Sequence, residues 1–380
     1  MESLRRRRSN SRFVLAVAII LTIMAGVTFV VLSAPTRGAG SGDEDAQKGT
    51  TAKALTPVDK EAATNKGDEL LLAGKLDEAA VQYQAAIETD KGNIAAMARL
   101  CKVLTLMYKS DEAIEIGKKA VSADGNNVEA LVNLSTAYDW NGDYAKATEL
   151  AAKAVQIDST YAPAYASLAE AYADQTNWQK AIEAAQQALG LDENNPDALR
   201  NMGYALEVKG DLDGAIGYYQ RAIQSRPTLA YPYVSLATAY RLQGKNQEAL
   251  SQYQKAIELQ PSNSRAYGGI GMVQYSQKKF DLAFAAFQKA IELDPTYALA
   301  YGSAAWSKYT LGEYDAALPF FQKAIEFQPQ NASNHAGLGW CYYYTQKYTE
   351  AWTEFRKALE INPDLGLAKN GISAVQDKRQ

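Results

Sequence analysis

The sequence has very few of the residues from which catalytic and metal sites are usually built. Its 380 residues include one histidine, His335, and two cysteines. A single imidazole cannot form a metal cluster, and no glycine-rich phosphate loop occurs in the chain. Acidic residues are scattered rather than set in the close pairs that glycoside hydrolysis uses. We therefore expect no enzymatic activity, no cofactor and no metal ion.

Positive charge is also lacking outside the amino-terminal segment. The formal net charge is −4, divided as +4 over residues 1–34, −1 over residues 35–59 and −7 over residues 60–380. Binding of nucleic acid needs basic residues clustered on the folded part of a protein. We therefore do not expect nucleic acid as a partner, and no feature indicates a small-molecule substrate.

One long uncharged run, residues 13–34, is apolar enough to cross a membrane. As a helix its 22 residues would be about 33 Å long, against a hydrocarbon core of roughly 30 Å. Five arginines precede it, so the positive-inside rule predicts a cytoplasmic basic segment at residues 1–12 and an extracytoplasmic location for the rest. A cleaved signal peptide is the alternative, although its apolar region would usually have only about 7–15 residues. Residues 35–59, rich in small and acidic residues, are interpreted as a flexible linker.

A 34-residue pattern repeats without gain or loss of a residue from residue 60 to residue 365. Its nine units are 60–93, 94–127, 128–161, 162–195, 196–229, 230–263, 264–297, 298–331 and 332–365. In the sixth unit two apolar series at helical spacing flank Gly244, which suits a helix end with positive φ, and Pro261 ends the second series. The pattern therefore predicts that each unit forms a hairpin of two helices. A hairpin this short buries too little apolar surface alone, so the units must stack.

Several positions of the unit keep one kind of residue. Positions 20 and 27 are alanine in all nine units, position 8 is small in all nine, and position 24 is aromatic in six. Small residues allow two helices to approach closely. Position 24 is small in units two to four, where Gly117, Ala151 and Ala185 predict thinner packing.

With tyrosine common at position 11 and proline at position 32 in the last five units, the pattern resembles the tetratricopeptide repeat. The resemblance covers about 306 of the 380 residues. It implies an all-α fold, a right-handed α-solenoid of nine helix-turn-helix repeats. The predicted transmembrane helix precedes the repeats, and residues 366–380 follow them as a capping helix. Because each unit of a solenoid is expected to touch only its neighbours, Cys101 and Cys341 should be buried and unpaired.

The resemblance also implies a concave face lined by the first helix of each unit, at positions 2, 5, 9, 12 and 13. The predicted peptide-binding groove consists of Tyr204, Arg241, Met272, Tyr275, Trp306, Tyr309, Trp340, Tyr343 and Tyr344. The middle units supply an acidic groove, which consists of Asp139, Glu170, Asp174 and Glu207. The aromatic residues either bind a partner through an apolar ring with a polar tip or pack against the next first helix and stiffen the array.

We expect a non-catalytic, membrane-tethered scaffold or adaptor that binds a protein or peptide segment in this groove, in envelope assembly, secretion or complex assembly. Some relatives bind a carboxyl terminus with a pair of residues, lysine and asparagine, at positions 5 and 9. No unit of this chain has that pair, so this mode of binding is not expected. A module that stacks cell-wall glycans on its aromatic residues, or a recruiting subunit of a membrane enzyme complex, are the alternatives.

Overall fold

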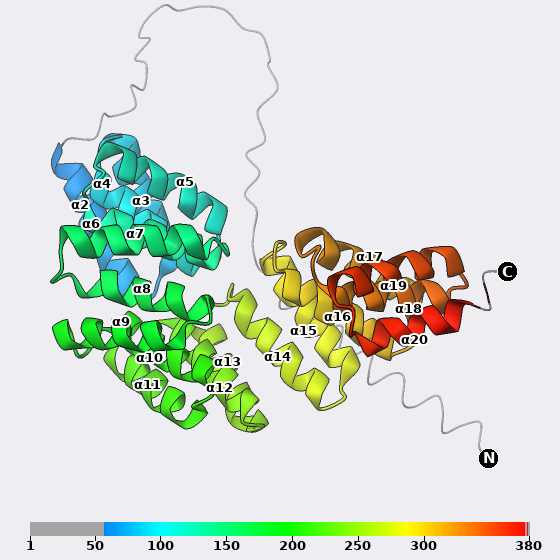
Figure 1. Cartoon of the computed structure of the whole chain (residues 1–380). Coiled ribbons are helices and arrows are strands. Elements are labelled where there is room, and N and C mark those ends of the chain that lie inside the picture. Colours follow the sequence, from blue (N-terminus) through cyan, green and yellow to red (C-terminus); the bar gives the residue numbers. More distant parts are fainter. Residues whose placement is uncertain (1–56, 377, 379–380) are drawn as a thin grey trace, which may run out of the picture. The chain divides into compact units, whose positions relative to one another are not determined.

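The computed structural model describes residues 57–376 and residue 378, which form 19 helices and no strand (Figure 1). The first helices of the hairpins are α2 (Pro57–Leu72), α4 (Ile94–Leu106), α6 (Val128–Trp140), α8 (Ala162–Asp174), α10 (Pro196–Lys209), α12 (Ala230–Leu242), α14 (Ser264–Ser276), α16 (Ala298–Thr310) and α18 (Ala332–Tyr344). The second helices are α3 (Leu76–Thr89), α5 (Ser110–Ala123), α7 (Tyr144–Ile157), α9 (Trp178–Leu191), α11 (Leu212–Ser225), α13 (Asn246–Leu259), α15 (Phe280–Leu293), α17 (Tyr314–Phe327) and α19 (Tyr348–Ile361). The last helix, α20 (Gly366–Gln376), packs on α18 and α19.

The predicted membrane-spanning segment, residues 13–34, lies outside the described residues, as does the linker up to residue 56. Helix α2 begins at Pro57, so the last residues assigned to the linker are already helical. Within the described part of the chain, no helix combines the length and apolar character needed to span a bilayer.

The helices from α4 to α18 that open each hairpin begin at the first residue of a 34-residue unit. Asparagine at the end of the preceding unit explains several of these starts, because its side chain accepts the backbone N–H three residues later, as Asn263 does from Ala266 at 3.0 Å. At position 15, between the two helices, all nine units have positive φ, and five of them use glycine there. Gly244, with φ of 76°, confirms the expected left-handed helix end.

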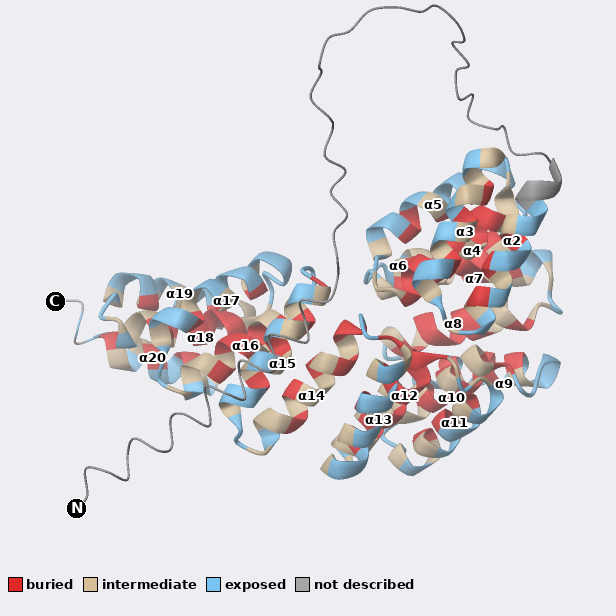
Figure 2. Cartoon of the chain, turned by 180° about the vertical axis from the view of Figure 1, so that it is seen from behind, coloured by how far each residue is buried: buried red, intermediate tan, exposed pale blue. Residues whose placement is uncertain are grey.

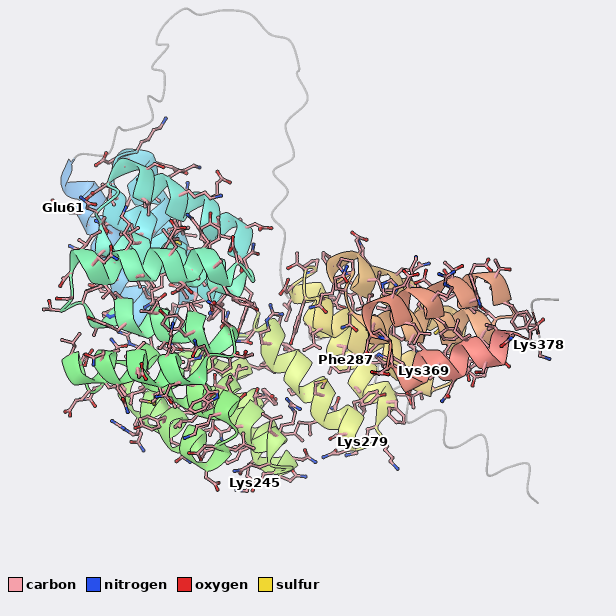
Figure 3. The ribbon with its side chains drawn as sticks, in the orientation of Figure 1. Glu61, Lys245, Lys279, Phe287, Lys369 and Lys378 are labelled. Carbon is pink, nitrogen blue, oxygen red and sulfur yellow. The ribbon has the colours of Figure 1, made fainter. Side chains whose placement is uncertain are left out.

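The core lies where the helices meet, as the buried residues in Figure 2 show. The alanines at positions 20 and 27 are fully buried in every unit. Each aromatic ring at position 24 lies against a glycine. A Cβ on Gly271 would come within 2.6 Å of the buried Phe287, which is labelled in Figure 3, and one on Gly337 within 2.4 Å of Phe321. Those glycines lie on the first helix of the ring's own unit or on the first helix of the next unit. The ring is therefore wedged between two successive first helices.

Where position 24 is small, that wedge is missing and the first helices meet directly. α4 packs on α6, α6 on α8, and α8 on α10, whereas α14, α16 and α18 touch one another only slightly. The expectation of thinner packing is wrong at Gly117, because a Cβ there would lie 2.9 Å from both Cys101 Sγ and a methyl group of Leu134. Closer approach of the helices fills the space that the ring occupies elsewhere.

Both cysteines are buried and unpaired, as predicted. The expectation that each unit touches only its neighbours is wrong, however, at the inner edge of the array. Gln260 donates to the Leu106 carbonyl at 3.1 Å, and Lys102 forms an ion pair with Asp197 at 3.1 Å. Small rotations between successive units add up, and they bring the inner ends of units one to three against units five to seven.

Candidate functional site

The inner face contains a cavity of about 400 Å³, here called the central pocket, between the first helices α6 to α14. Its lining combines charged side chains with tyrosine rings rather than purely apolar groups. It includes Tyr108, Trp140, Glu170, Asp174, Arg200, Tyr204, Glu207, Tyr231, Arg241, Arg265, Met272 and Tyr297. A polar pocket of this kind can orient a ligand or side chain through several directed contacts.

The pocket is acidic on the α8 side and basic on the α12 and α14 side. Glu170 is ion-paired with Arg200 and accepts a hydrogen bond from the Trp140 indole at 2.9 Å. Asp174 accepts the Tyr204 hydroxyl. On the other side, the Arg241 guanidinium has an Nε without a hydrogen-bond partner among the described residues.

Three further contacts define the electrostatics of the walls. Glu207 accepts the Tyr219 hydroxyl at 3.0 Å, and burial raises the pKa of Glu207. Arg265 lies 3.6 Å from the centre of the Tyr297 ring and is ion-paired with Asp294 at 3.3 Å. The charge of Arg265 is therefore already compensated, as is that of Arg200.

Asp139 lies behind this acidic side on α6 and is only 3% exposed. Neither of its carboxyl oxygens has a hydrogen-bond partner among the described residues if the group is ionised. Burial, and then the negative charges of Glu170 and Asp174, raise the pKa of Asp139 far above its usual range. Asp139 therefore holds a proton at neutral pH and can donate it toward Asp174.

A second candidate lies in units eight and nine, where tyrosines of α16 to α19 form a connected surface. We define this tyrosine surface as Tyr309, Tyr314, Tyr343, Tyr344 and Tyr348. The rings of Tyr314 and Tyr344 stack with centroids 4.3 Å apart, and Tyr344 also lies 5.4 Å from Tyr343. Tyr344 remains 46% exposed, so the surface is accessible to a partner.

The two tryptophans beside this surface pack inside the array. Trp306 lies edge-on to Phe321 with centroids 5.1 Å apart, and Trp340 contacts Phe355 at 5.4 Å. The Trp340 indole also donates to the Leu367 carbonyl of α20 at 3.1 Å. Both tryptophan rings are partly buried. The interpretation that the aromatic residues pack within the array therefore fits these tryptophans better than it fits the exposed tyrosines.

The structure thus divides the predicted groove residues between two places. The central pocket is lined by Glu170, Asp174, Tyr204, Glu207, Arg241 and Met272. The aromatic network of α16 to α19 contains Trp306, Tyr309, Trp340, Tyr343 and Tyr344. Tyr275 lies apart, edge-on to Phe280 at 5.2 Å, and Asp139 lies behind the pocket.

Sequence reasoning did not single out several residues that line the pocket. Trp140 and Arg265 occupy positions 13 and 2 of their units, which the repeat pattern already assigns to the concave face. Tyr108 and Tyr297 occupy turn positions 15 and 34, for which the pattern gives no signal. They reach the pocket only because units two and three contact units six and seven.

The residues most often used in catalysis have structural roles here. His335 is buried, with Nδ1 2.6 Å from a Glu354 carboxylate oxygen and Nε2 3.1 Å from the Pro329 carbonyl. Over the range that the structure describes, no three His, Cys, Asp or Glu side chains are grouped so that they could hold a metal ion. The inner face offers hydrogen bonding, ion pairing and ring contact.

Comparison with protein families matches two sequence profiles, both described as tetratricopeptide repeat. One covers residues 167–230, 234–298 and 303–365, and the other covers residues 104–172. Together these matches cover more than half of the chain. No curated protein matches the sequence.

Comparison with solved structures also finds similar chains. A chain in the crystal structure of the APC/C hetero-tetramer Cut9-Hcn1 superimposes with a TM-score of 0.65 at 17% identity, over 79% of this chain and 59% of that one. A tetratricopeptide repeat protein from Parabacteroides merdae gives 0.46 at 19% identity, over 66% and 99%. MamA gives 0.38 at 28% identity, over 43% and 95%.

Proposed function

Because this chain belongs to the tetratricopeptide repeat family, we propose that it is a non-catalytic scaffold that binds a segment of a partner protein on the tyrosine surface. Repeats of this family generally act as scaffolds rather than as enzymes. The observation that carries the proposal is the connected set of partly exposed tyrosine rings across units eight and nine.

Tyrosine suits this role for physical reasons. Its ring buries a large apolar area, its few rotatable bonds keep the entropy cost of ordering low, and its hydroxyl can pair with a partner's backbone. The rings of this surface are already held by one another, as Tyr343 is by Tyr344 and by Tyr348 at 5.8 Å. A partner segment therefore meets a preorganised surface.

The test replaces Tyr314 and Tyr344 together by alanine, since these stacked rings lie at the centre of the surface. We expect recovery of protein partners from a membrane extract to fall roughly tenfold or more, because such aromatic contacts dominate interface energies. The matched control is Tyr144→Ala, a similarly exposed tyrosine on α7 outside the surface. If the double variant retains the same partners at the same strength, with an unchanged helical spectrum, the tyrosine surface is not the binding site.

The alternative ligand is a cell-wall glycan, because the stacked tyrosines could also support a sugar ring. Sedimentation of the full-length protein with purified wall polysaccharide separates the two. Co-sedimentation that the Tyr314→Ala, Tyr344→Ala double variant abolishes would favour the glycan over the protein segment.

We also propose that residues 13–34 anchor the scaffold in a membrane, with residues 1–12 cytoplasmic and the repeats on the opposite side. The proposal rests on the length of the apolar run and on the five arginines before it. Tethering would hold the binding surface near partners in envelope assembly, secretion or complex assembly. A reporter that is active only after export, fused after Gln380, should be active, and an inactive reporter would reverse the orientation.

A further inference from the structure

We propose that the acidic side of the central pocket is a binding site for one cationic group, a guanidinium or ammonium ion carried by a basic side chain or by a free amine. This site lies apart from the tyrosine surface and does not depend on the function proposed for it. Its walls come from α6, α8, α10 and the start of α12.

The first argument is the balance of charge. Arg200 is ion-paired with Glu170, and Arg265 is ion-paired with Asp294. Asp174, which lines the cavity, meets only neutral groups, the hydroxyl of Tyr204 and the protonated carboxyl group of Asp139. The pocket therefore has a carboxylate that forms no ion pair with any residue of the described chain, while Arg241, the remaining cation of the lining, interacts with Glu207.

The second argument is the burial of Asp139, a residue that does not itself line the cavity. Its side chain is almost completely buried, faces Asp174 and Glu170, and has no donor for either oxygen. An unpaired carboxyl group buried against two others costs folding free energy. A cation bound beside Asp174 would offset the negative charges of Glu170 and Asp174, which add to the effect of burial in keeping Asp139 protonated.

The third argument is the shape and chemistry of the space. The cavity of about 400 Å³ can admit a side chain or a small amine, and the rings of Trp140, Tyr204 and Tyr231 lie in its walls. Aromatic faces attract cations, most strongly where water is excluded. The carboxylates thus supply charge, and the rings supply walls that suit a guanidinium or an ammonium group.

Binding at this site is coupled to proton release. The titratable and charged groups around the carboxyl pair of Asp139 and Asp174 are Tyr144 on α7, Glu170 on α8, and Arg200 and Tyr204 on α10. Without a bound cation Asp139 keeps its proton, and a bound cation lowers the pKa of Asp139. Affinity should therefore rise with pH, by at most about tenfold per pH unit for one released proton.

The test uses the full-length protein and titration calorimetry. The probe is a glycine peptide with one central arginine, and its matched control is the same peptide with citrulline, which has nearly the same shape and no charge. Putrescine serves as the free amine. We expect the arginine peptide or putrescine to bind, and the one that binds more tightly identifies the source of the cation. If the peptide is the ligand, the citrulline peptide should bind roughly tenfold or more weakly than the arginine peptide.

Variants locate the site. Asp174→Asn should weaken cation binding roughly tenfold or more, whereas Asp281→Asn, an exposed aspartate in the first turn of α15, should leave it unchanged. The Tyr314→Ala, Tyr344→Ala double variant should also leave it unchanged, which separates this site from the tyrosine surface. No binding of either cation, or equal binding by wild type and a folded Asp174→Asn variant, would overturn the proposal.

The proton is measured separately. Titrations in two buffers with different ionisation enthalpies should show proton release by the wild-type protein. Asp139→Asn, which keeps a hydrogen-bond donor toward Asp174, should bind the cation with markedly less release. Equal release by both proteins would show that the proton does not come from the buried pair and would overturn the coupling.

Discussion

Units two to four and units seven to nine have the same 34-residue frame but build different inner faces, and position 24 accounts for much of the difference. In units two to four a small residue lets successive first helices pack directly on one another, and their inner face meets units five to seven around a charged pocket. In units seven to nine a phenylalanine separates successive first helices. On units eight and nine the inner face carries partly exposed tyrosines.

The comparison teaches that the separation of successive first helices follows the size of one side chain on the second helix. A ring at position 24 contacts both its own first helix and the next, so it fixes their separation. Removing the ring allows closer approach, and three successive close approaches bring distant units together. The chemistry of the inner face then depends on whether distant units meet. Where they meet, they enclose a pocket, and where they do not, the inner face presents an exposed surface.

The largest expected effect comes from removing a wedge. Phe321→Ala should destabilise the protein by about 3–5 kcal/mol, because the ring is fully buried against Gly337 and Trp306. Leu282→Ala, at a position 54% exposed, is the matched control and should cost less than about 0.5 kcal/mol. Urea denaturation followed by circular dichroism measures both.

A further measurement shows whether Phe321 acts as a wedge. Amide exchange in α16 and α18 should speed up in the Phe321→Ala variant, since these helices lose the ring that fixes their spacing. Stability equal to that of Leu282→Ala would show that position 24 does not hold the first helices apart.

The second effect concerns closure between distant units. Gly74 and Gly244 have the same φ of 76°, but a Cβ on Gly74 would lie 2.6 Å from the Thr228 carbonyl oxygen, whereas a Cβ on Gly244 has no atom within 4 Å. Both alanine variants strain the backbone equally. Gly74→Ala should therefore cost about 1–3 kcal/mol more than Gly244→Ala, by overpacking.

Urea denaturation of the two variants measures this difference. Thr228 also donates to the Leu72 carbonyl at 2.9 Å, so Thr228→Val should reproduce part of the loss by removing that hydrogen bond. Equal stability of Gly74→Ala and Gly244→Ala would mean that the contact between units one and five contributes nothing to the fold.

Much of this architecture could be predicted from the sequence, and the limits have a physical reason. The 34-residue period places the starts of α4 to α18, and the glycine pattern predicts turns such as that at Gly244. Closure does not follow from any single unit, because it is the sum of small rotations set by residues such as Ala151 and Ala185. The pocket residues Tyr108 and Tyr297 depend on that closure, so no local pattern identifies them.

The candidate sites show the same division. The repeat pattern places Asp139, Asp174 and Tyr344 on the inner face, but it gives no information on how deeply each is buried. Asp139 is buried because α6 and α8 approach closely, whereas Tyr344 on α18 remains exposed. Burial decides which of these carboxylates and rings can meet a partner.

The third effect tests the buried carboxyl pair. Asp139→Asn should stabilise the protein by about 1–3 kcal/mol near neutral pH, because it replaces a group that is costly to ionise with an amide that can still donate to Asp174. Since the folded-state pKa of Asp139 is raised, its favourable contribution is complete below the unfolded pKa of about 3.9 and is lost as pH rises. The gain should therefore be larger at pH 8 than at pH 5.

Thermal unfolding of both proteins across this pH range measures the gain. Asp281→Asn is the control, because that carboxylate is exposed and should show little pH-dependent change. A gain from Asp139→Asn that stays constant between pH 5 and pH 8 would contradict a protonated Asp139 in the folded state.

The smallest effect concerns the turn between the two helices of a unit. Thr176 in unit four and Gln346 in unit nine are exposed and have φ of 59° and 62°, where other units use glycine. A β-branched side chain is more strained there than an unbranched one. Thr176→Gly should therefore raise stability by about 0.5–1 kcal/mol, and Gln346→Gly by less, in urea denaturation. An equal gain at both sites would show that left-handed backbone, and not branching at Cβ, sets the cost in both halves of the array.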